Sequence, residues 1–273
     1  MEQVKAKKSL GQNFLRDVDI IDGILEIADL GSEDRVLEIG PGTGALTSHL
    51  LARVASVIAV EIDQDMIVRL GETFRESKGL SLLEANILDM DLGTYLRDAG
   101  FEDGKYKIIA NIPYYITAPI IRLLLSLAIR PERMVLMVQE EVADRLSAAP
   151  GEMSLLSLMA QYYADVSKEL FVPRSAFIPE PKVDSAVIRL VPKRPYSKDT
   201  DRILFRTARA GFAARRKTLA NNLSSAFHIE RKQAEEMIVG IGLGRLVRAQ
   251  ELSVENWIAL SEEVEAMRNE TGN

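Results

Sequence analysis

The sequence predicts an α/β domain built on a mostly parallel, seven-stranded sheet, followed by a small all-α C-terminal domain. Up to about residue 190, short apolar runs alternate with longer segments of helical periodicity. Strands that alternate with helices form right-handed βαβ units and therefore parallel sheets. Beyond a polar segment with two prolines at 192–197, only helical patterning remains. The domains are therefore expected at 1–193 and 200–273, with a linker at about 194–199.

The individual elements follow from the spacing of apolar residues. Seven short apolar runs are expected to form strands at 36–39, 57–61, 81–84, 108–111, 134–139, 170–172 and 185–191. Segments with an apolar residue every three or four positions are expected to form helices at 19–30, 44–53, 65–74, 118–127, 140–147, 154–163, 201–213, 216–225, 231–239 and 254–267. The last two strands have no helix between them, so they should pair as an antiparallel hairpin at the sheet edge.

Composition excludes several kinds of site. The 273 residues include no cysteine and only two histidines, His49 and His228. Disulfide frameworks, thiolate catalysis, cysteine-ligated zinc and multi-histidine metal sites are therefore excluded, and no metal is expected. No apolar run approaches the roughly 20 residues of a membrane helix, and the first residues contain no apolar signal core. We expect a cytoplasmic protein that acts without a membrane.

Charge is unevenly distributed along the chain. The formal net charge is −6, yet residues 201–250 carry ten Lys and Arg against four Asp and Glu. A polyanion responds to local potential rather than to total charge. We interpret Arg215, Arg216 and Lys217 as contacts to RNA phosphates, and a solvated helix face is the alternative interpretation.

A glycine turn follows the first predicted strand. Residues 38–44 read Glu-Ile-Gly-Pro-Gly-Thr-Gly, and Glu61 ends the next strand, where it could accept hydrogen bonds from ribose hydroxyls. The spacing of Gly40, Gly42 and Ala45 also satisfies a loose dinucleotide fingerprint. The glycines alone therefore do not exclude NAD as the cofactor. The order Gly40-x-Gly42-x-Gly44 after Glu38 favours S-adenosylmethionine, because its sulfonium and ammonium groups favour a nearby carboxylate. A purely structural turn is the third alternative.

The tetrapeptide Asn111-Ile112-Pro113-Tyr114 ends the fourth predicted strand. The Asn111 side-chain oxygen and the Ile112 carbonyl can both accept hydrogen bonds from one exocyclic amino group, and Tyr114 can stack on the ring that carries it. Phe177 is the candidate for an opposite wall, unless it packs under its own loop. Parallel strands place the tetrapeptide and the glycine turn in one crevice. The sequence therefore predicts an adenine amine facing a methyl donor, although a simple strand-end turn would leave the same short pattern.

Several stretches together resemble the KsgA-type ribosomal RNA adenine dimethyltransferases. They cover nearly the whole chain, at 8–15, 38–44, 111–114, 177–187, 215–219 and 248–253. The resemblance implies a Rossmann-like class I methyltransferase fold. It also implies N6,N6-dimethylation of two adjacent adenines in the 3′-terminal hairpin of small-subunit rRNA, within a partly assembled subunit. S-adenosylmethionine would be the methyl donor, S-adenosylhomocysteine the product, and the enzyme a monomer.

The resemblance also assigns roles to individual residues. The catalytic positions, already predicted from the residues themselves, are Asn111, Ile112, Tyr114 and Phe177. The expected cofactor contacts are Asn13, Leu15, Gly40, Glu61, Asn86 and Asn111.

Two positions depart from the family pattern. Asn86 stands where the family usually has the Asp that contacts the cofactor's adenine, with Asp89 as a nearby substitute. Tyr115 replaces a small polar residue, which could alter the rim of the pocket.

Other functions also fit this sequence. One is a large-subunit rRNA adenine methyltransferase of the macrolide-resistance type, which would share the cofactor core. Another is a mainly binding protein on the same fold, such as an assembly checkpoint or a transcription factor. The intact tetrapeptide 111–114 argues against an inactive enzyme.

Overall fold

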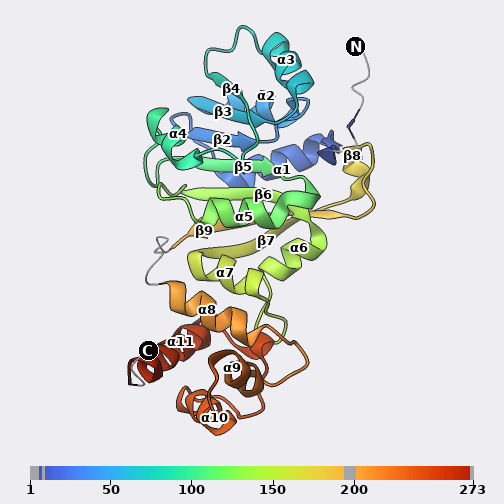
Figure 1. Cartoon of the computed structure of the whole chain (residues 1–273). Coiled ribbons are helices and arrows are strands. Elements are labelled where there is room, and N and C mark those ends of the chain that lie inside the picture. The colour runs from blue at the N-terminus through green and yellow to red at the C-terminus, as the bar shows by residue number, and fades with distance from the viewer. Residues whose placement is uncertain (1–5, 8–9, 194–200, 271–273) are drawn as a thin grey trace. The chain divides into compact units, whose positions relative to one another are not determined.

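The computed structural model describes residues 6–7, 10–193 and 201–270. The chain divides into two compact units (Figure 1). The first contains Met1–Asp144 and Ala164–Pro195, and the second contains Arg145–Tyr163 and Tyr196–Asn273. The linker predicted at about 194–199 lies outside the described residues.

A seven-stranded sheet forms the centre of the first unit. Its order is β4-β3-β2-β5-β6-β9-β7, and only β9 runs antiparallel to its neighbours. The strands are β2 (Arg35–Ile39), β3 (Ser56–Glu61), β4 (Leu80–Glu84), β5 (Lys107–Asn111), β6 (Arg133–Gln139), β7 (Ala164–Val172) and β9 (Ser185–Pro192). The predicted sheet and its antiparallel pair are thus confirmed. Strand β7 starts six residues earlier than predicted, because its exposed edge residues are polar and hide the strand pattern.

Helices cover the sheet (Figure 1). They are α1 (Val18–Ala28), α2 (Ala45–Leu51), α3 (Gln64–Thr73), α4 (Leu92–Asp98), α5 (Thr117–Leu125) and α6 (Glu140–Leu146), with the 3₁₀ turns η2 (Tyr114–Ile116) and η3 (Arg174–Ala176). Apolar residues of α1 and α2 pack in one buried cluster with alternate sheet residues such as Val36, Ile109 and Val135. The intervening Leu37 and Ile108 are also buried, so the central strands are covered on both faces. Helix α4 was not predicted, because its buried residues, Leu92 and Leu96, form a single apolar pair rather than a repeating pattern.

A second, two-stranded sheet joins distant parts of the chain. Strand β1 (Phe14–Leu15) pairs antiparallel with β8 (Phe177–Ile178), with Phe14 opposite Ile178 and Leu15 opposite Phe177. Two-residue strands leave no periodicity in a sequence, and this pairing was not predicted. It fixes the N-terminal segment beside the loop that contains Phe177.

The second unit is helical, as predicted for the C-terminal region. It contains α7 (Leu155–Tyr163), α8 (Asp201–Gly211), α9 (Leu219–Phe227), α10 (Arg231–Gly240), η4 (Ala249–Glu251) and α11 (Val254–Glu270). The expected boundary needs a correction, because residues 145–163 group with the C-terminal helices rather than with the sheet. The reason is a tertiary contact: the hydroxyls of Tyr162 and Tyr163 donate to the two carboxylate oxygens of buried Asp201, at 2.7 and 2.6 Å.

Trp257 of α11 fills the centre of the second unit. It is fully buried and lies 5.2 Å from Phe212, measured between ring centroids. Gly211 permits this packing, because a Cβ at that position would overlap the indole and lie 2.8 Å from Leu219 Cδ1. Within the described part of the chain, no helix is long and apolar enough to cross a membrane.

We therefore predict that Gly211→Ala lowers the free energy of unfolding of the second unit by about 1–3 kcal/mol through overpacking. Gly240→Ala is the matched control, since nothing lies within 4 Å of its added Cβ. That control should leave stability unchanged or raise it slightly, because alanine favours helices. Urea unfolding followed by fluorescence of Trp257, the only tryptophan, measures both. Equal effects of the two substitutions would contradict the packing argument.

Candidate active site

A cavity opens at the carboxyl ends of β2, β3 and β5. Strands β2 and β5 are neighbours. The strand after β2 lies toward one edge of the sheet and the strand after β5 lies toward the other, which makes their junction a topological switch point. A Cβ built on Gly40 would lie 3.6 Å from the Asn111 carbonyl oxygen, so the glycine turn and the tetrapeptide 111–114 are in contact. Every predicted catalytic and cofactor residue lines this cavity: Asn13, Leu15, Gly40, Glu61, Asn86, Asn111, Ile112, Tyr114 and Phe177.

The glycine turn requires its glycines. Gly40, Gly42 and Gly44 have φ values of 69°, 55° and 81°, in a region that side-chain-bearing residues rarely adopt. A Cβ on Gly44 would also lie 2.7 Å from the Phe74 ring, and one on Gly42 would lie 3.1 Å from the Phe14 ring. The turn therefore presents backbone without side chains to the cavity. Phe14 of the N-terminal segment packs against one side of this turn.

Glu61 lies at the end of β3 and is held by backbone amides. Its Oε2 accepts from Gly42 N at 3.1 Å, and its Oε1 accepts from Ile62 N and Asp63 N at 2.8 and 3.0 Å. Burial raises the pKa of Glu61, and these three hydrogen bonds partly offset that rise. A carboxylate has about four acceptor sites, so about one remains for a ligand hydroxyl.

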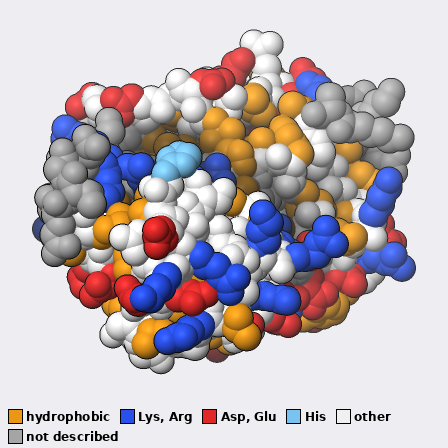
Figure 2. Space-filling model, turned by 60° about the horizontal axis from the view of Figure 1, so that its bottom comes forward, with side chains coloured by type: hydrophobic (Ala, Val, Ile, Leu, Met, Phe, Trp, Pro, Cys, Tyr) orange, Lys and Arg blue, Asp and Glu red, His pale blue; other side chains and the backbone are white. Residues whose placement is uncertain are grey.

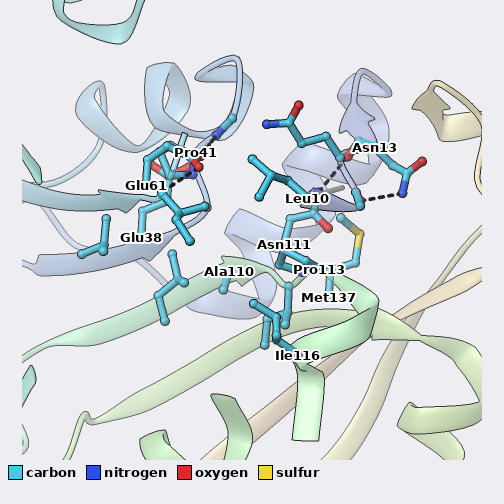
Figure 3. Close-up of a pocket in the computed structure, with 18 of the residues that line it drawn as sticks. Leu10, Asn13, Glu38, Pro41, Glu61, Ala110, Asn111, Pro113, Ile116 and Met137 are labelled. Carbon is cyan, nitrogen blue, oxygen red and sulfur yellow. Dashed lines mark hydrogen bonds between the residues drawn. The ribbon is translucent and has the colours of Figure 1, made fainter. Parts of the chain in front are cut away.

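Glu38 is the more deeply buried carboxyl of the pair. Only 2% of the residue is exposed, and its Oε2 accepts from Thr47 Oγ1 at 2.7 Å. Burial raises its pKa to about 8, and the nearby Glu61 adds to that rise. Figure 3 shows Glu38, Pro41 and Glu61 together on one side of the cavity, with Asn13 and Asn111 on the other.

Asp63 anchors the N-terminal segment beside the site. It accepts from Lys7 Nζ and Gln12 Nε2, both at 2.6 Å, and from Asp65 N at 3.0 Å. Burial alone would raise the pKa of Asp63, but these hydrogen bonds hold it below its usual value. The segment that carries Asn13 and Leu15 is thus fixed at both ends, by Asp63 and by strand β8.

Asn111 directs an acceptor into the cavity. Its Nδ2 donates to the Asn13 carbonyl at 3.4 Å (Figure 3), which orients Oδ1 the other way. The Ile112 amide donates to the Met137 carbonyl at 3.1 Å. Among the described residues, no donor bonds the Asn111 Oδ1 or the Ile112 carbonyl. Two neighbouring acceptors therefore remain for a ligand amino group.

The two candidate aromatic walls differ in exposure. Tyr114 is half-buried, and its hydroxyl lies 2.7 Å from Ser185 Oγ. Burial raises the pKa of Tyr114. Phe177 is only 2% exposed and belongs to the buried apolar cluster, although it also lines the cavity. Its proposed role in stacking stays a prediction.

The departure at position 86 is accommodated by a local pair. Asn86 Nδ2 donates to Asp89 at 2.6 Å, and its Oδ1 accepts from Leu88 N at 3.2 Å. Asn86 lines the cavity, whereas Asp89 is exposed and is absent from the lining. Asp89, the expected substitute for the missing carboxylate, therefore lies outside the cavity.

The predicted RNA-binding residues lie in the second unit. Arg215, Arg216 and Lys217 are exposed in the turn before α9, which begins at Leu219 behind an N-cap at Thr218, not at 216 as expected. Figure 2 shows one face of the molecule, on which Lys and Arg side chains are interspersed with Asp and Glu. The structure does not bring these residues into the cavity lining.

Sequence reasoning missed four residues that hold the site together: Gln12, Thr47, Asp63 and Ser185. Asp63 could have been found as the N-cap preceding a helix, because its carboxylate accepts from Asp65 N. Thr47 carries no comparable signal, because its partner Glu38 becomes close only when α2 packs on the sheet. Within the described residues, no group of three or more potential ligands could hold a metal ion.

The fold and the site define a class of protein. A seven-stranded sheet with one antiparallel strand, a bare glycine turn after β2 and an acidic end to β3 are the features of Rossmann-like, S-adenosylmethionine-dependent methyltransferases. Two solved structures are similar over nearly the whole chain. The 23S rRNA methyltransferase ErmE is 26% identical, with a TM-score of 0.74 and coverage of 93% of this chain and 100% of that one. A dimethyladenosine transferase from Plasmodium falciparum is 26% identical, with a TM-score of 0.77 and coverage of 95% and 98%.

Sequence comparison narrows the class to one family. The family model described as ribosomal RNA adenine dimethylase matches residues 3–266, and the chain belongs to this family. Two relatives named ribosomal RNA small subunit methyltransferase A are each 41% identical over 263 residues. The one from Levilactobacillus brevis matches 94% of this chain and 89% of its own length, and the one from Bacillus thuringiensis matches 93% and 90%. This membership contradicts the NAD alternative.

The residues of the cavity fit S-adenosylmethionine, the methyl donor of this class. The bare turn at 40–44 lets the backbone approach a ligand closely, Glu61 retains acceptor capacity, and the buried Glu38 carboxyl lies in the same wall. When bound, the donor supplies an electrophilic methyl group whose leaving group is already in place. The individual cofactor contacts stay predictions, at Asn13, Leu15, Gly40, Glu61, Asn86 and Asn111.

The buried Glu38 carboxyl predicts a pH-dependent stability. Its pKa in the folded state lies above the ordinary value of 4.5 for a glutamic acid. The stabilisation that protonated Glu38 permits is therefore present below about 4.5 and is lost as the pH rises through about 8. Glu38→Gln keeps the Thr47 hydrogen bond without this loss. The unfolding free energy of this variant should rise relative to wild type by about 4 kcal/mol between pH 5 and 9, because roughly three pH units of this window lie between the two pKa values.

Denaturant unfolding across this pH range measures the difference. The exposed carboxylate variant Glu33→Gln serves as the control and should run parallel to wild type. Parallel curves for wild type and Glu38→Gln would show that Glu38 does not titrate in this window.

Proposed function

We propose that this protein dimethylates N6 of two adjacent adenines in the 3′-terminal hairpin of small-subunit rRNA, converting S-adenosylmethionine to S-adenosylhomocysteine. The observation that carries the proposal is the pair of hydrogen-bond acceptors at Asn111 and Ile112. This pair adjoins the glycine turn, because a Cβ on Gly40 would lie 3.6 Å from the Asn111 carbonyl oxygen. The names of the relatives support the small-subunit substrate.

The acceptor pair addresses the difficult half of the reaction. The adenine amine is a weak nucleophile, because its lone pair is delocalised into the ring. Hydrogen bonds from both N6 hydrogens to Asn111 Oδ1 and the Ile112 carbonyl favour a pyramidal nitrogen and stabilise the positive charge that develops on it. With the donor bound, the nitrogen would form a bond to the methyl carbon as the carbon–sulfur bond breaks, and the methylated amine would release its proton to water. A second cycle on the same nitrogen gives the dimethylated base.

The proposed substrate must present an unstacked base. An adenine held against Tyr114 has left its helix or begun in a loop, because its edge is otherwise covered. Arg215, Arg216 and Lys217 would neutralise phosphates of the same RNA, which makes binding dependent on salt. The proposed particle is a partly assembled small subunit, recognised by a monomer, with the cytoplasm as the expected compartment.

We predict that Asn111→Ala reduces methyl transfer by about 10²–10³-fold, the usual effect of removing one preorganised polar contact from a reacting group. Binding of S-adenosylhomocysteine should weaken much less. Single-turnover rates and calorimetric titration measure the two quantities. Asn86→Ala is the matched control, a second cavity asparagine that should weaken cofactor binding and change the rate at saturating donor little. Near-normal turnover of Asn111→Ala would exclude the proposed catalytic role.

The substrate itself is tested by comparing two RNAs. We expect transfer of up to four methyl groups to small-subunit particles that lack this modification, and little transfer to protein-free large-subunit RNA. Mass spectrometry of nuclease digests locates the products. Preference for large-subunit RNA would instead favour the macrolide-resistance type, a possibility that the structural similarity to ErmE raises. Absence of transfer to either RNA would favour a binding role.

A further inference from the structure

Tyr115 is an exposed aromatic side chain at the edge of the candidate active site. It follows Tyr114 in the turn η2 and lines the same cavity, yet 57% of it remains exposed. Its environment differs from that of Tyr114. The Tyr114 hydroxyl is bonded to Ser185, whereas the Tyr115 hydroxyl forms no hydrogen bond with any described residue.

The Tyr115 ring is supported on one side. A Cβ on Gly11 would lie 3.3 Å from ring atom Cδ1 and 3.5 Å from Cε1, so the ring packs over the bare backbone of Gly11. Gly11 has a φ of 60°, which disfavours any larger residue there. The turn that carries the ring continues directly into α5, and Thr117 Oγ1 donates to the Tyr114 carbonyl at 3.2 Å. The ring is therefore held in place while most of its surface faces solvent.

A supported, exposed ring beside a nucleobase pocket has a specific use. When a base leaves its stack to enter a pocket, the neighbouring base loses a stacking partner. An aromatic side chain at the pocket mouth can replace that partner, and such stacking tolerates different bases because each has a π-face. The ring carries no charge, so a phosphate contact would have to come from the Tyr115 hydroxyl alone.

We propose that Tyr115 is a stacking platform for the nucleobase adjacent to the target adenine. This proposal rests on the proposed function and deepens it, because it makes the identity and integrity of the neighbouring nucleotide part of substrate recognition. Tyr114 would then serve the adenine that reacts and Tyr115 the base beside it.

The test combines a protein change with an RNA change. Tyr115→Ala and Tyr115→Phe are compared with wild type on small-subunit particles whose RNA is either intact or abasic at the neighbour of one target adenine. The measured quantities are kcat/KM for methyl transfer and the affinity for S-adenosylhomocysteine. Removing the neighbouring base should cost wild type about 5- to 150-fold in kcat/KM, which corresponds to one base–aromatic stack.

Tyr115→Ala should show a similar loss on intact RNA and little further loss on abasic RNA, because both changes remove the same contact. Tyr115→Phe should behave as wild type, and cofactor affinity should not change. Unchanged kcat/KM for Tyr115→Ala would overturn the proposal, as would losses that multiply in the double change. A loss that tracks weaker cofactor affinity would assign the ring to the donor instead. Failure of wild type to methylate either particle would refute the proposed function itself.

Discussion

The hydrogen-bonded pairing of β2 with β5 is the constraint on which the site depends. It sets Ile39 opposite Ala110, so the next residues along the two strands, Gly40 and Asn111, meet at the same sheet edge. A Cβ on Gly40 would lie 3.6 Å from the Asn111 carbonyl oxygen, an ordinary van der Waals distance, so the neighbouring strand touches the turn without excluding a side chain. The glycine turn is bare because its three glycines have positive φ values, and because the Phe14 and Phe74 rings pack where a Cβ on Gly42 or Gly44 would lie. Backbone geometry alone thus brings the glycine turn, where the methyl donor is expected, next to the tetrapeptide 111–114, where the adenine amine is expected.

The walls of the cavity are stabilised by polar groups that are buried and nearly all bonded. Glu38, Glu61 and Asp63 would each be costly to bury without partners. A threonine hydroxyl, three backbone amides and the Lys7–Gln12 pair supply those partners. The three carboxyls respond differently, since burial dominates at Glu38 while hydrogen bonds dominate at Asp63. The pKa is therefore raised at Glu38 in the cavity wall and lowered at Asp63, which lies outside the cavity lining.

The strands and the candidate site could be predicted because both depend on local patterns. Fully covered strands read as apolar runs, and residues at the ends of parallel strands must share an edge. Features that depend on tertiary contacts could not be predicted in this way. The bond from Tyr162 to Asp201 draws α7 into the second unit, and no periodicity reveals it. Burial of Phe177 and the Asp63 bonds to Lys7 and Gln12 likewise arise only when distant segments meet.

The β1–β8 pairing links the N-terminal segment, which borders the glycine turn, to the loop that contains Phe177. It does so through four residues, Phe14, Leu15, Phe177 and Ile178. Side chains alternate between the faces of a strand, so a slip of one position would exchange Phe14, which packs on Gly42, with the buried Leu15. An insertion or deletion in either strand would consequently disturb the floor of the donor site and the loop of Phe177 together. These two stretches are therefore expected to evolve at constant length and to tolerate paired rather than single replacements.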